Sequence, residues 1–186
     1  MAKHIWKAGT MLYPLPVAMV SCGTMEKSNI MTAAWTGIIN SDPPMTYISL
    51  RPERYSYGII KEAGEFVINL TTERLLWNAD FCGVKTGRDR RKFSLPGLTA
   101  VKASQLDAPM IAESPVNLEC VVDKIMPLGS HDMFVSKIVA VNVNEDLLDA
   151  KGVLHLEKAA LIVTSHGSYY ALGRRLGTFG YSVKKK

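Results

Sequence analysis

Short stretches of apolar residues, bounded by proline and glycine, dominate the pattern of hydrophobic and polar positions along the chain. Most have the length and composition of buried strands. After Pro115 the pattern changes to two longer strands, and polar and apolar residues alternate through the second of them, as in a strand with one buried face. Residues 126–132 predict the turn between these two. The predicted strands are residues 16–22, 29–39, 45–50, 65–70, 116–125, 133–144 and 160–164.

Two short helices are expected between the early strands. Residues 55–62 precede Ala63-Gly64, where glycine suits a helix C-cap, and residues 72–81 begin with Thr-Thr-Glu, a helix N-terminal signal. The chain shows neither an internal repeat nor a low-complexity linker, so residues 1–186 are interpreted as a single domain. Many strands with few helices favour a β-barrel or sandwich over a doubly wound sheet.

The composition is that of one globular domain, with 47% hydrophobic and 21% charged residues in a chain of 186. The apolar runs fall short of the roughly 18–20 residues that a membrane-spanning helix requires. Lys3, His4 and Lys7 stand where a signal peptide would carry its apolar core. We therefore expect a cytoplasmic protein without membrane attachment.

The net charge of +5 first suggests a polyanionic partner, but two short segments hold the whole surplus. One is residues 85–92, where five cations surround Asp89, and the other is the tail at residues 184–186, interpreted as a solvated end. A nucleic-acid-binding domain usually spreads its basic residues over a face. A single small phosphate therefore suits residues 85–92 better, and no nucleic-acid partner is expected.

The cysteines and histidines are too widely spaced to predict a metal site. The chain also lacks the glycine-rich fingerprints of a Rossmann dinucleotide site and of a P-loop. Any phosphate-bearing cofactor must therefore be held by side chains and strand-end amides.

Four segments carry candidate chemistry. Residues 28–35 combine Asn and Thr with small residues that would admit a flat ligand, residues 49–57 join a strand end to a helix start, residues 88–93 are rich in cations, and residues 128–132 place His131 in a turn. Each has a structural alternative. These are, in the same order, a core strand with a tryptophan, a capping serine with a solvated arginine, a solvated basic helix end, and an exposed turn histidine.

Taken together and in this order, the segments resemble the flavin reductase-like proteins of the FMN-binding split-barrel class, and most closely the flavoredoxin group. The resemblance extends from about Met11 to Tyr181. It rests on the strand at residues 16–22, the Asn29-x-x-Thr32-Ala33-Ala34-Trp35 segment, Pro43-Pro44, Ser49-Leu50-Arg51, Ser56, residues 66–70 (FVINL), residues 89–93 and the Gly-x-His turn.

The resemblance implies a mainly β fold, a six-stranded Greek-key split β-barrel with a few short flanking helices, which forms a homodimer and binds FMN near the subunit interface. Asn29, Met31, Thr32, Ala33, Ala34 and Trp35 would line the isoalloxazine ring, with Ser49 and Arg51 beside it. Ser56, Tyr57 and Lys92 would hold the ribityl phosphate. His131 would approach the cofactor and is the candidate catalytic residue.

Electron transfer through bound FMN is the function that this resemblance implies, either as a flavoredoxin-like carrier or as an NAD(P)H:flavin oxidoreductase. The electron donor would be a redox partner protein or NAD(P)H. Many NAD(P)H-using relatives have aspartate where this chain has Ser130, which favours the carrier. The alternatives are a non-catalytic flavin- or haem-binding barrel and, from the basic segment, a nucleic-acid-binding barrel.

Overall fold

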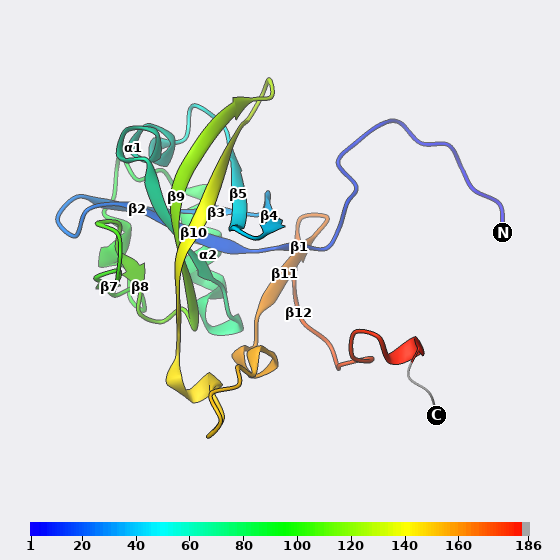
Figure 1. The fold of residues 1–186 in the computed structure, drawn as a ribbon. Helices are drawn as coiled ribbons and strands as arrows, with labels where there is room; N and C mark the ends of the chain where they lie inside the picture. Colours follow the sequence, from blue (N-terminus) through cyan, green and yellow to red (C-terminus); the bar gives the residue numbers. More distant parts are fainter. Residues whose placement is uncertain (184–186) are drawn as a thin grey trace.

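The computed structural model describes residues 1–183, and strands account for most of its regular structure (Figure 1). The basic tail at residues 184–186 lies outside the described residues. The strands are β1 (Leu15–Pro16), β2 (Ala18–Gly23), β3 (Ser28–Ala33), β4 (Thr36–Ser41), β5 (Pro44–Leu50), β6 (Glu65–Leu70), β7 (Ala100–Val101), β8 (Met110–Ile111), β9 (Val116–Pro127), β10 (Asp132–Val143), β11 (Ile162–Ser165) and β12 (Ser168–Ala171). The α-helices are α1 (Tyr55–Ala63) and α2 (Leu76–Val84), and short 3₁₀ turns cover Glu73–Leu75, Lys92–Ser94, Glu145–Leu147, Leu156–Ala159 and Tyr181–Val183.

The principal sheet is antiparallel and follows the order β3-β2-β6-β9-β10-β5-β4. Its two edge strands, β3 and β4, are consecutive in the chain and only Ala34 and Trp35 separate them. Two residues span only about 10 Å between their neighbours, so the sheet must curl until its edges approach one another at this point. The fold is therefore mainly β with few helices, consistent with a split barrel.

Two predictions about this sheet were wrong. Within residues 1–183 the principal sheet has seven strands, not six, and residues 29–39 do not form one strand. The chain bends at Ala34-Trp35, so β3 pairs with β2 whereas β4 pairs with β5 at the other edge. Both strands mix apolar residues with small and polar ones, SNIMTA in β3 and TGIINS in β4, and nothing in that pattern marks a change of partner.

The two helices form where the sequence predicts them. Gly64 ends α1 in the left-handed conformation, with φ of 70°, and its amide donates to the carbonyl of Ile60 at 2.9 Å. The second predicted helix begins as a 3₁₀ turn at Glu73–Leu75 and continues as α2 to Val84, three residues beyond its predicted end. The helix α1 packs against β3 on the face of Met31 and α2 on the face of Ile30, and the start of α1 and the end of α2 both line the pocket described below.

The core occupies both faces of the sheet. Alternate residues of β2 point in opposite directions: Val20 packs with Phe66 and Phe134 on one face, and Met19 packs with α2 residues on the other. All of these side chains are buried. Because β2 is covered on both faces, its residues from Ala18 to Cys22 are all buried, and Ser21, the polar one among them, donates to the carbonyl of Pro109.

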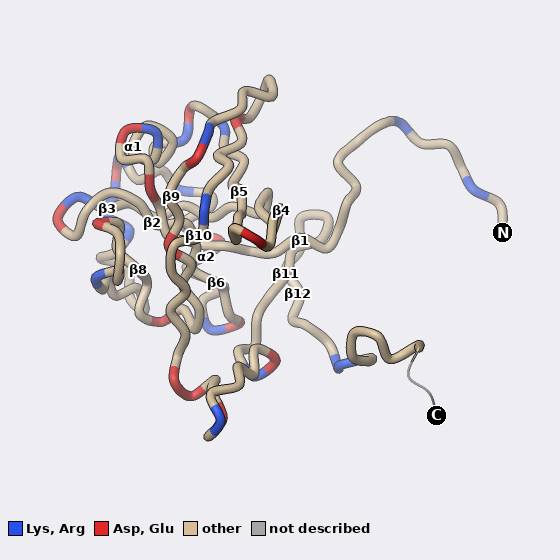
Figure 2. Tube along the Cα trace, in the orientation of Figure 1, with Lys and Arg blue, Asp and Glu red and all other residues tan. Residues whose placement is uncertain are grey.

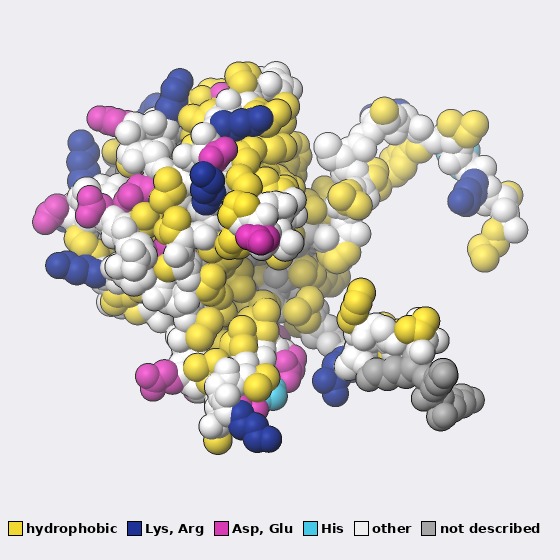
Figure 3. Space-filling model, viewed as in Figure 1, with side chains coloured by type: hydrophobic (Ala, Val, Ile, Leu, Met, Phe, Trp, Pro, Cys, Tyr) yellow, Lys and Arg dark blue, Asp and Glu magenta, His cyan; other side chains and the backbone are white. Residues whose placement is uncertain are grey.

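The two ends of the chain lie outside the principal sheet. β1, β11 and β12 form a small separate sheet, and residues 1–14 leave it as an extended arm without helix or strand (Figure 1). Hydrophobic side chains gather on the face over the long strands and along the arm (Figure 3). Ile38 on β4 and Val139 and Val141 on β10 are exposed. Among residues 1–183 the helices are all too short or too polar to cross a bilayer.

Candidate functional site

A groove opens where β3 and the end of β5 meet the start of α1 and the segment after α2. It consists of two adjoining pockets that share Met31, Arg51 and Arg54. The larger, which we call the cationic pocket, has a volume of about 360 Å³, and the smaller, which we call the tryptophan pocket, about 180 Å³. Together they lie within the size range of small-molecule sites, roughly 300–1,000 Å³.

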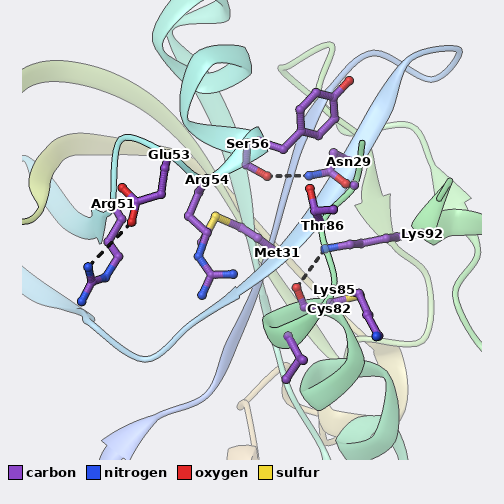
Figure 4. A pocket seen from close by; sticks show the side chains of 13 residues that line it. Asn29, Met31, Arg51, Glu53, Arg54, Ser56, Cys82, Lys85, Thr86 and Lys92 are labelled. Atoms are coloured by element: carbon purple, nitrogen blue, oxygen red, sulfur yellow. Dashed lines mark hydrogen bonds and ion pairs between the residues drawn. The ribbon is translucent and has the colours of Figure 1, made fainter. Parts of the chain in front are cut away.

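The floor of the cationic pocket consists of buried polar side chains (Figure 4). Asn29 on β3 donates through Nδ2 to Oγ of Ser56 on α1 at 2.7 Å, and both residues are almost fully buried. A Cβ added to Gly87 would lie 2.0 Å from Oδ1 of Asn29, so only glycine lets the segment after α2 approach so closely. The pocket is therefore shaped by residues far apart in sequence that fit tightly together.

The charge of the cationic pocket is strongly positive. Four cationic side chains line it, those of Arg51, Arg54, Lys85 and Lys92, against the single carboxylate of Glu53. Arg51 lies 3.7 Å from Glu53 across an exposed ion pair, which contributes little to stability. Elsewhere on the chain, cations and carboxylates are interspersed (Figure 2). The pocket thus provides a local field for a small anion.

The first turn of α1 adds to this field. Arg54, the N-cap residue of α1, makes no capping hydrogen bond with its side chain, and instead its guanidinium donates to the carbonyl of Gly83 at 2.8 Å. The amide of Tyr57 donates to the carbonyl of Arg54 at 2.9 Å, so the amides of Tyr55 and Ser56 are the ones left for water or a ligand. Helix N-termini combine such amides with a partial positive charge and bind phosphate readily.

Lys92 is the most unusual cation of the group because it is only 2% exposed. Its Nζ donates to the carbonyl of Cys82 at 2.9 Å, and no carboxylate among residues 1–183 forms an ion pair with it. Burial lowers the pKa of Lys92, and burial also raises the pKa values of the nearby thiols of Cys22 and Cys82 to about 11. A buried ammonium without a counter-charge favours an anionic ligand energetically.

The tryptophan pocket has a different chemistry. Backbone and side chains of residues 31–35 form one wall, and Ser49, Leu50 and His131 form the other. The rings of Trp35 and His131 lie against one another, with centroids 4.3 Å apart and planes tilted by 34°. Burial, and then the positive charge of Arg51, lowers the pKa of His131, so the imidazole is neutral at neutral pH. This end of the groove can accommodate a flat, polar ring system.

The structure brings nearly all the predicted site residues together in this groove. Asn29, Ser56 and Lys92 line the cationic pocket, Met31 and Arg51 line both pockets, and Thr32, Ala33, Ala34, Trp35, Ser49 and His131 line the tryptophan pocket.

Tyr57 is the exception, because it lines neither pocket. Its hydroxyl donates to Oδ2 of Asp132 at 2.5 Å, and its ring packs edge-on against Phe134 at 5.2 Å. That hydrogen bond raises the pKa of Tyr57. Tyr57 therefore joins α1 to β10, on the side of the helix away from the groove.

Several groove residues were missed by sequence reasoning. Arg54 and Glu53 lie within a segment that the sequence singled out, and Lys85 lies in the basic cluster, so charge alone could have indicated them. Thr86, Gly87 and Cys82 carry no such signal, because their places depend on how the segment after α2 packs on β3. Within residues 1–183, His, Cys, Asp and Glu side chains do not gather in groups of three or more that could hold a metal ion.

Comparison with known proteins shows which family the chain belongs to. The family model described as "Flavin reductase like domain" matches residues 10–170. Flavoredoxin of Desulfovibrio vulgaris (Miyazaki F) is 32% identical, with a TM-score of 0.90 over 98% of this chain and 100% of its own. Flavoredoxin from Methanosarcina acetivorans is 26% identical, with a TM-score of 0.87 over 98% and 100% of the two chains.

A relative of known activity is more distant. The NADPH-flavin oxidoreductase of Streptomyces viridifaciens is 26% identical over 128 residues, which cover 68% of this chain and 65% of that protein. The family match spans most of the chain, including both pockets of the groove. The protein therefore belongs to the flavin reductase-like family.

Proposed function

We propose that the protein binds FMN in this groove and passes electrons through it as a flavoredoxin-like carrier. The observation that carries the proposal is the cationic pocket, where buried Lys92 has no carboxylate partner among residues 1–183 and the amides of Tyr55 and Ser56 at the start of α1 have no acceptor within these residues. Both features suit a phosphate monoester. Family membership and the two similar flavoredoxins support a flavin as the molecule that carries it.

Different residues would bind the phosphate and the ring of FMN. Lys92, Lys85 and the amides of α1 would bind the phosphate, and Ser56 is fixed beside them by its hydrogen bond with Asn29. Arg51 and Arg54 line both pockets and would lie between the phosphate and the ring. The tryptophan pocket would take the isoalloxazine, and its neutral His131 would add no charge beside the ring. When bound, FMN supplies the hydride or single-electron chemistry, for which the protein sets potential and access.

An absorption spectrum tests this proposal directly. Protein purified without added flavin, or titrated with FMN, is expected to show a flavin spectrum shifted by binding at a stoichiometry of one per chain. A spectrum of the mixture equal to the sum of its parts would refute it. Stoichiometric binding without turnover for any donor and acceptor would instead support the alternative, a binding module without catalysis.

The relative named NADPH-flavin oxidoreductase favours a second candidate, in which NAD(P)H reduces the flavin directly. The two functions separate under anaerobic conditions. A reductase bleaches its flavin rapidly with NADH or NADPH, whereas a carrier is reduced by a protein donor or dithionite and not by the nicotinamides. Ser130, whose hydroxyl lies 2.9 Å from Nδ1 of His131, supports the carrier, because many NAD(P)H-using relatives carry aspartate there.

We also infer that two copies of the chain associate. Apolar side chains are exposed on β4 and β10, including Ile38 at 84% and Val141 at 55%. Hydrophobic side chains also gather on the face over the long strands (Figure 3). Faces of this kind are unusual on a protein that acts alone. Sedimentation at several concentrations is expected to give twice the chain mass of 20.5 kDa, and a single-chain mass throughout would contradict the inference.

A further inference from the structure

The hairpin between β9 and β10 carries His131 to the tryptophan pocket, but the paired part of the hairpin stops one residue short of it. Asp132 is the first residue of β10 and pairs with Leu50 on β5, so His131 lies just beyond the ladder. At the tip, the amide of Leu128 donates to the carbonyl of His131 at 2.9 Å, and Ser130 is exposed. The direction of the imidazole therefore depends on how the end of β10 is held.

Asp132 anchors this end of β10 to the helix α1. Tyr57 donates its hydroxyl to Oδ2 of Asp132 at 2.5 Å, and its ring packs edge-on against Phe134, with centroids 5.2 Å apart. Because side chains alternate along a strand, Asp132 and Phe134 share the face that meets α1. His131, one residue earlier, points to the opposite face, where Trp35 lies. Tyr57 therefore holds the face of β10 that directs His131 towards Trp35.

The contact between Tyr57 and Asp132 is of a strong kind. Hydrogen bonds from a hydroxyl to a carboxylate are shorter and stronger than those between neutral groups. Among residues 1–183, Asp132 forms no ion pair, and Tyr57 supplies the hydrogen bond to its carboxylate. This hydrogen bond raises the pKa of Tyr57, so the hydroxyl stays protonated and remains a donor at neutral pH.

The same turn of α1 also reaches the cationic pocket. Ser56 lines that pocket and accepts a hydrogen bond from Asn29 at 2.7 Å, whereas Tyr57, the next residue, holds the hairpin. A helix fixes neighbouring residues about 100° apart around its axis. The start of α1 thus connects the residues proposed for the phosphate with the hairpin that carries His131.

We propose that Tyr57 is a positioning residue, whose hydrogen bond to Asp132 holds His131 against Trp35 at the end of the groove where the flavin ring would lie. Tyr57 lines neither pocket and acts through Asp132 and the hairpin. The effect on flavin binding rests on the proposed function. The placement of His131 does not, because this chain alone makes the contact between His131 and Trp35.

Tyr57→Phe removes the hydroxyl and keeps the ring on Phe134, so the core is retained. NMR of the imidazole in the flavin-free chain, assigned with His131→Gln, reports its position, because the Trp35 ring shifts the resonances of protons stacked on it. In Tyr57→Phe we expect this ring-current shift to shrink. The pKa of His131 is expected to rise towards its ordinary value of 6.5, as the imidazole becomes less buried and moves away from Arg51.

The flavin affinities give a second measurement. Fluorescence titrations of Tyr57→Phe are expected to show FMN and riboflavin binding weakened by the same factor, roughly threefold to tenfold, because the ring contacts change and the phosphate contacts do not. The double variant Tyr57→Phe with Asp132→Ala is expected to differ no more from the wild type than either single variant, because both substitutions remove the same hydrogen bond.

Two other variants serve as controls. In Tyr169→Phe, the lost hydroxyl is also one that donates to an aspartate, Oδ1 of Asp80 at 3.0 Å, but it joins β12 to α2 and not to β10. This variant is expected to leave the His131 resonances and both flavin affinities unchanged. Asp132→Asn keeps an acceptor for Tyr57 and is expected to retain the position of His131, whereas Asp132→Ala should reproduce the effect of Tyr57→Phe.

Several results would overturn the proposal. They are unchanged His131 resonances and pKa in Tyr57→Phe, an equal change in Tyr169→Phe, or additive changes in the double variant. A displaced imidazole with unchanged flavin affinities would overturn the role of Tyr57 towards the flavin. If Tyr57→Phe does not fold, Asp132→Ala compared with Asp132→Asn tests the same hydrogen bond. A chain that binds no FMN, but whose His131 resonances move as expected, would refute the proposed function alone.

Discussion

Replacing Lys92 by methionine removes one charge from the cationic pocket and keeps most of the side-chain volume. Lys92 is 2% exposed, so methionine refills the space and the packing changes little. A hydrogen bond to a charged group contributes about 1.5–3 kcal/mol, which corresponds to roughly a tenfold to hundredfold change in affinity. Lys92→Met is therefore expected to weaken FMN binding by that factor and to leave riboflavin binding nearly unchanged, because riboflavin has no phosphate.

Flavin fluorescence titrations with FMN and riboflavin measure this difference. Arg88→Ala is the matched control, because Arg88 belongs to the same basic segment but lines neither pocket of the groove. It is expected to leave both affinities within about twofold, as for a solvated surface charge. Thermal melting of each variant shows whether Lys92→Met has lost its fold along with the hydrogen bond to Cys82.

The same variant isolates a pH dependence. Burial lowers the pKa of Lys92 from the ordinary lysine value of 10.5, so the pocket loses this charge in a pH window below 10.5 and FMN affinity is expected to fall as pH rises through that window. Without ligand, the unfolded chain binds more protons at Lys92 in that window, so the contribution of Lys92 to the free energy of unfolding rises with pH. Both effects are absent from Lys92→Met. Equal losses of FMN and riboflavin affinity in Lys92→Met would refute the placement of Lys92 on the phosphate.

Three further perturbations test other parts of the structure. Gly87→Ala forces a methyl against Asn29 and is expected to cost about 1–3 kcal/mol in chemical denaturation and to weaken FMN binding; an unchanged midpoint would show that the segment simply moves. Glu119 is fully buried, and although burial alone would raise its pKa, hydrogen bonds from Ser104, Gln105 and Asn142 outweigh that effect and hold the pKa below the ordinary glutamate value of 4.5. Its stabilisation is therefore present above 4.5 and lost as pH falls through the folded pKa, so Glu119→Gln is expected to be about 1.5–3 kcal/mol less stable at neutral pH and to converge with the wild type in acid. The imidazolium of His131 quenches Trp35 fluorescence on contact, so the fluorescence of the flavin-free protein is expected to titrate with a midpoint below 6.5, and His131→Gln should abolish that step.

Much of the fold could be predicted from local patterns. The strands at residues 65–70 and 116–125 and the helix at residues 55–62 match β6, β9 and α1 closely, because each has a clear period and a clear end signal such as Gly64. The shortest strands could not be predicted from such patterns, because β7 and β8 have two residues each, which is too few for a period to be visible. Their existence depends on pairing with one another and not on their own sequence.

The site could be predicted as a set of residues but not as a shape. The asparagine, the basic cluster and the turn histidine are visible in sequence, and the family resemblance supplied their common purpose. Tyr57 shows the limit of that reasoning, because its neighbour Ser56 faces the groove while Tyr57 faces β10. Adjacent residues on a helix point about 100° apart, so a matching segment does not mean that every residue in it touches the ligand.

The sequence by itself determined both helices and most of the longer strands, and it located the surplus positive charge in one octapeptide and a tail. Only the tertiary structure decided that residues 29–39 divide between the two edges of the sheet and that Lys92 is buried. The reason is physical. Period and end signals act over a few neighbouring residues, whereas burial, partner choice and cavity shape arise from contacts between residues tens of positions apart, such as Asn29 with Ser56 and Gly87.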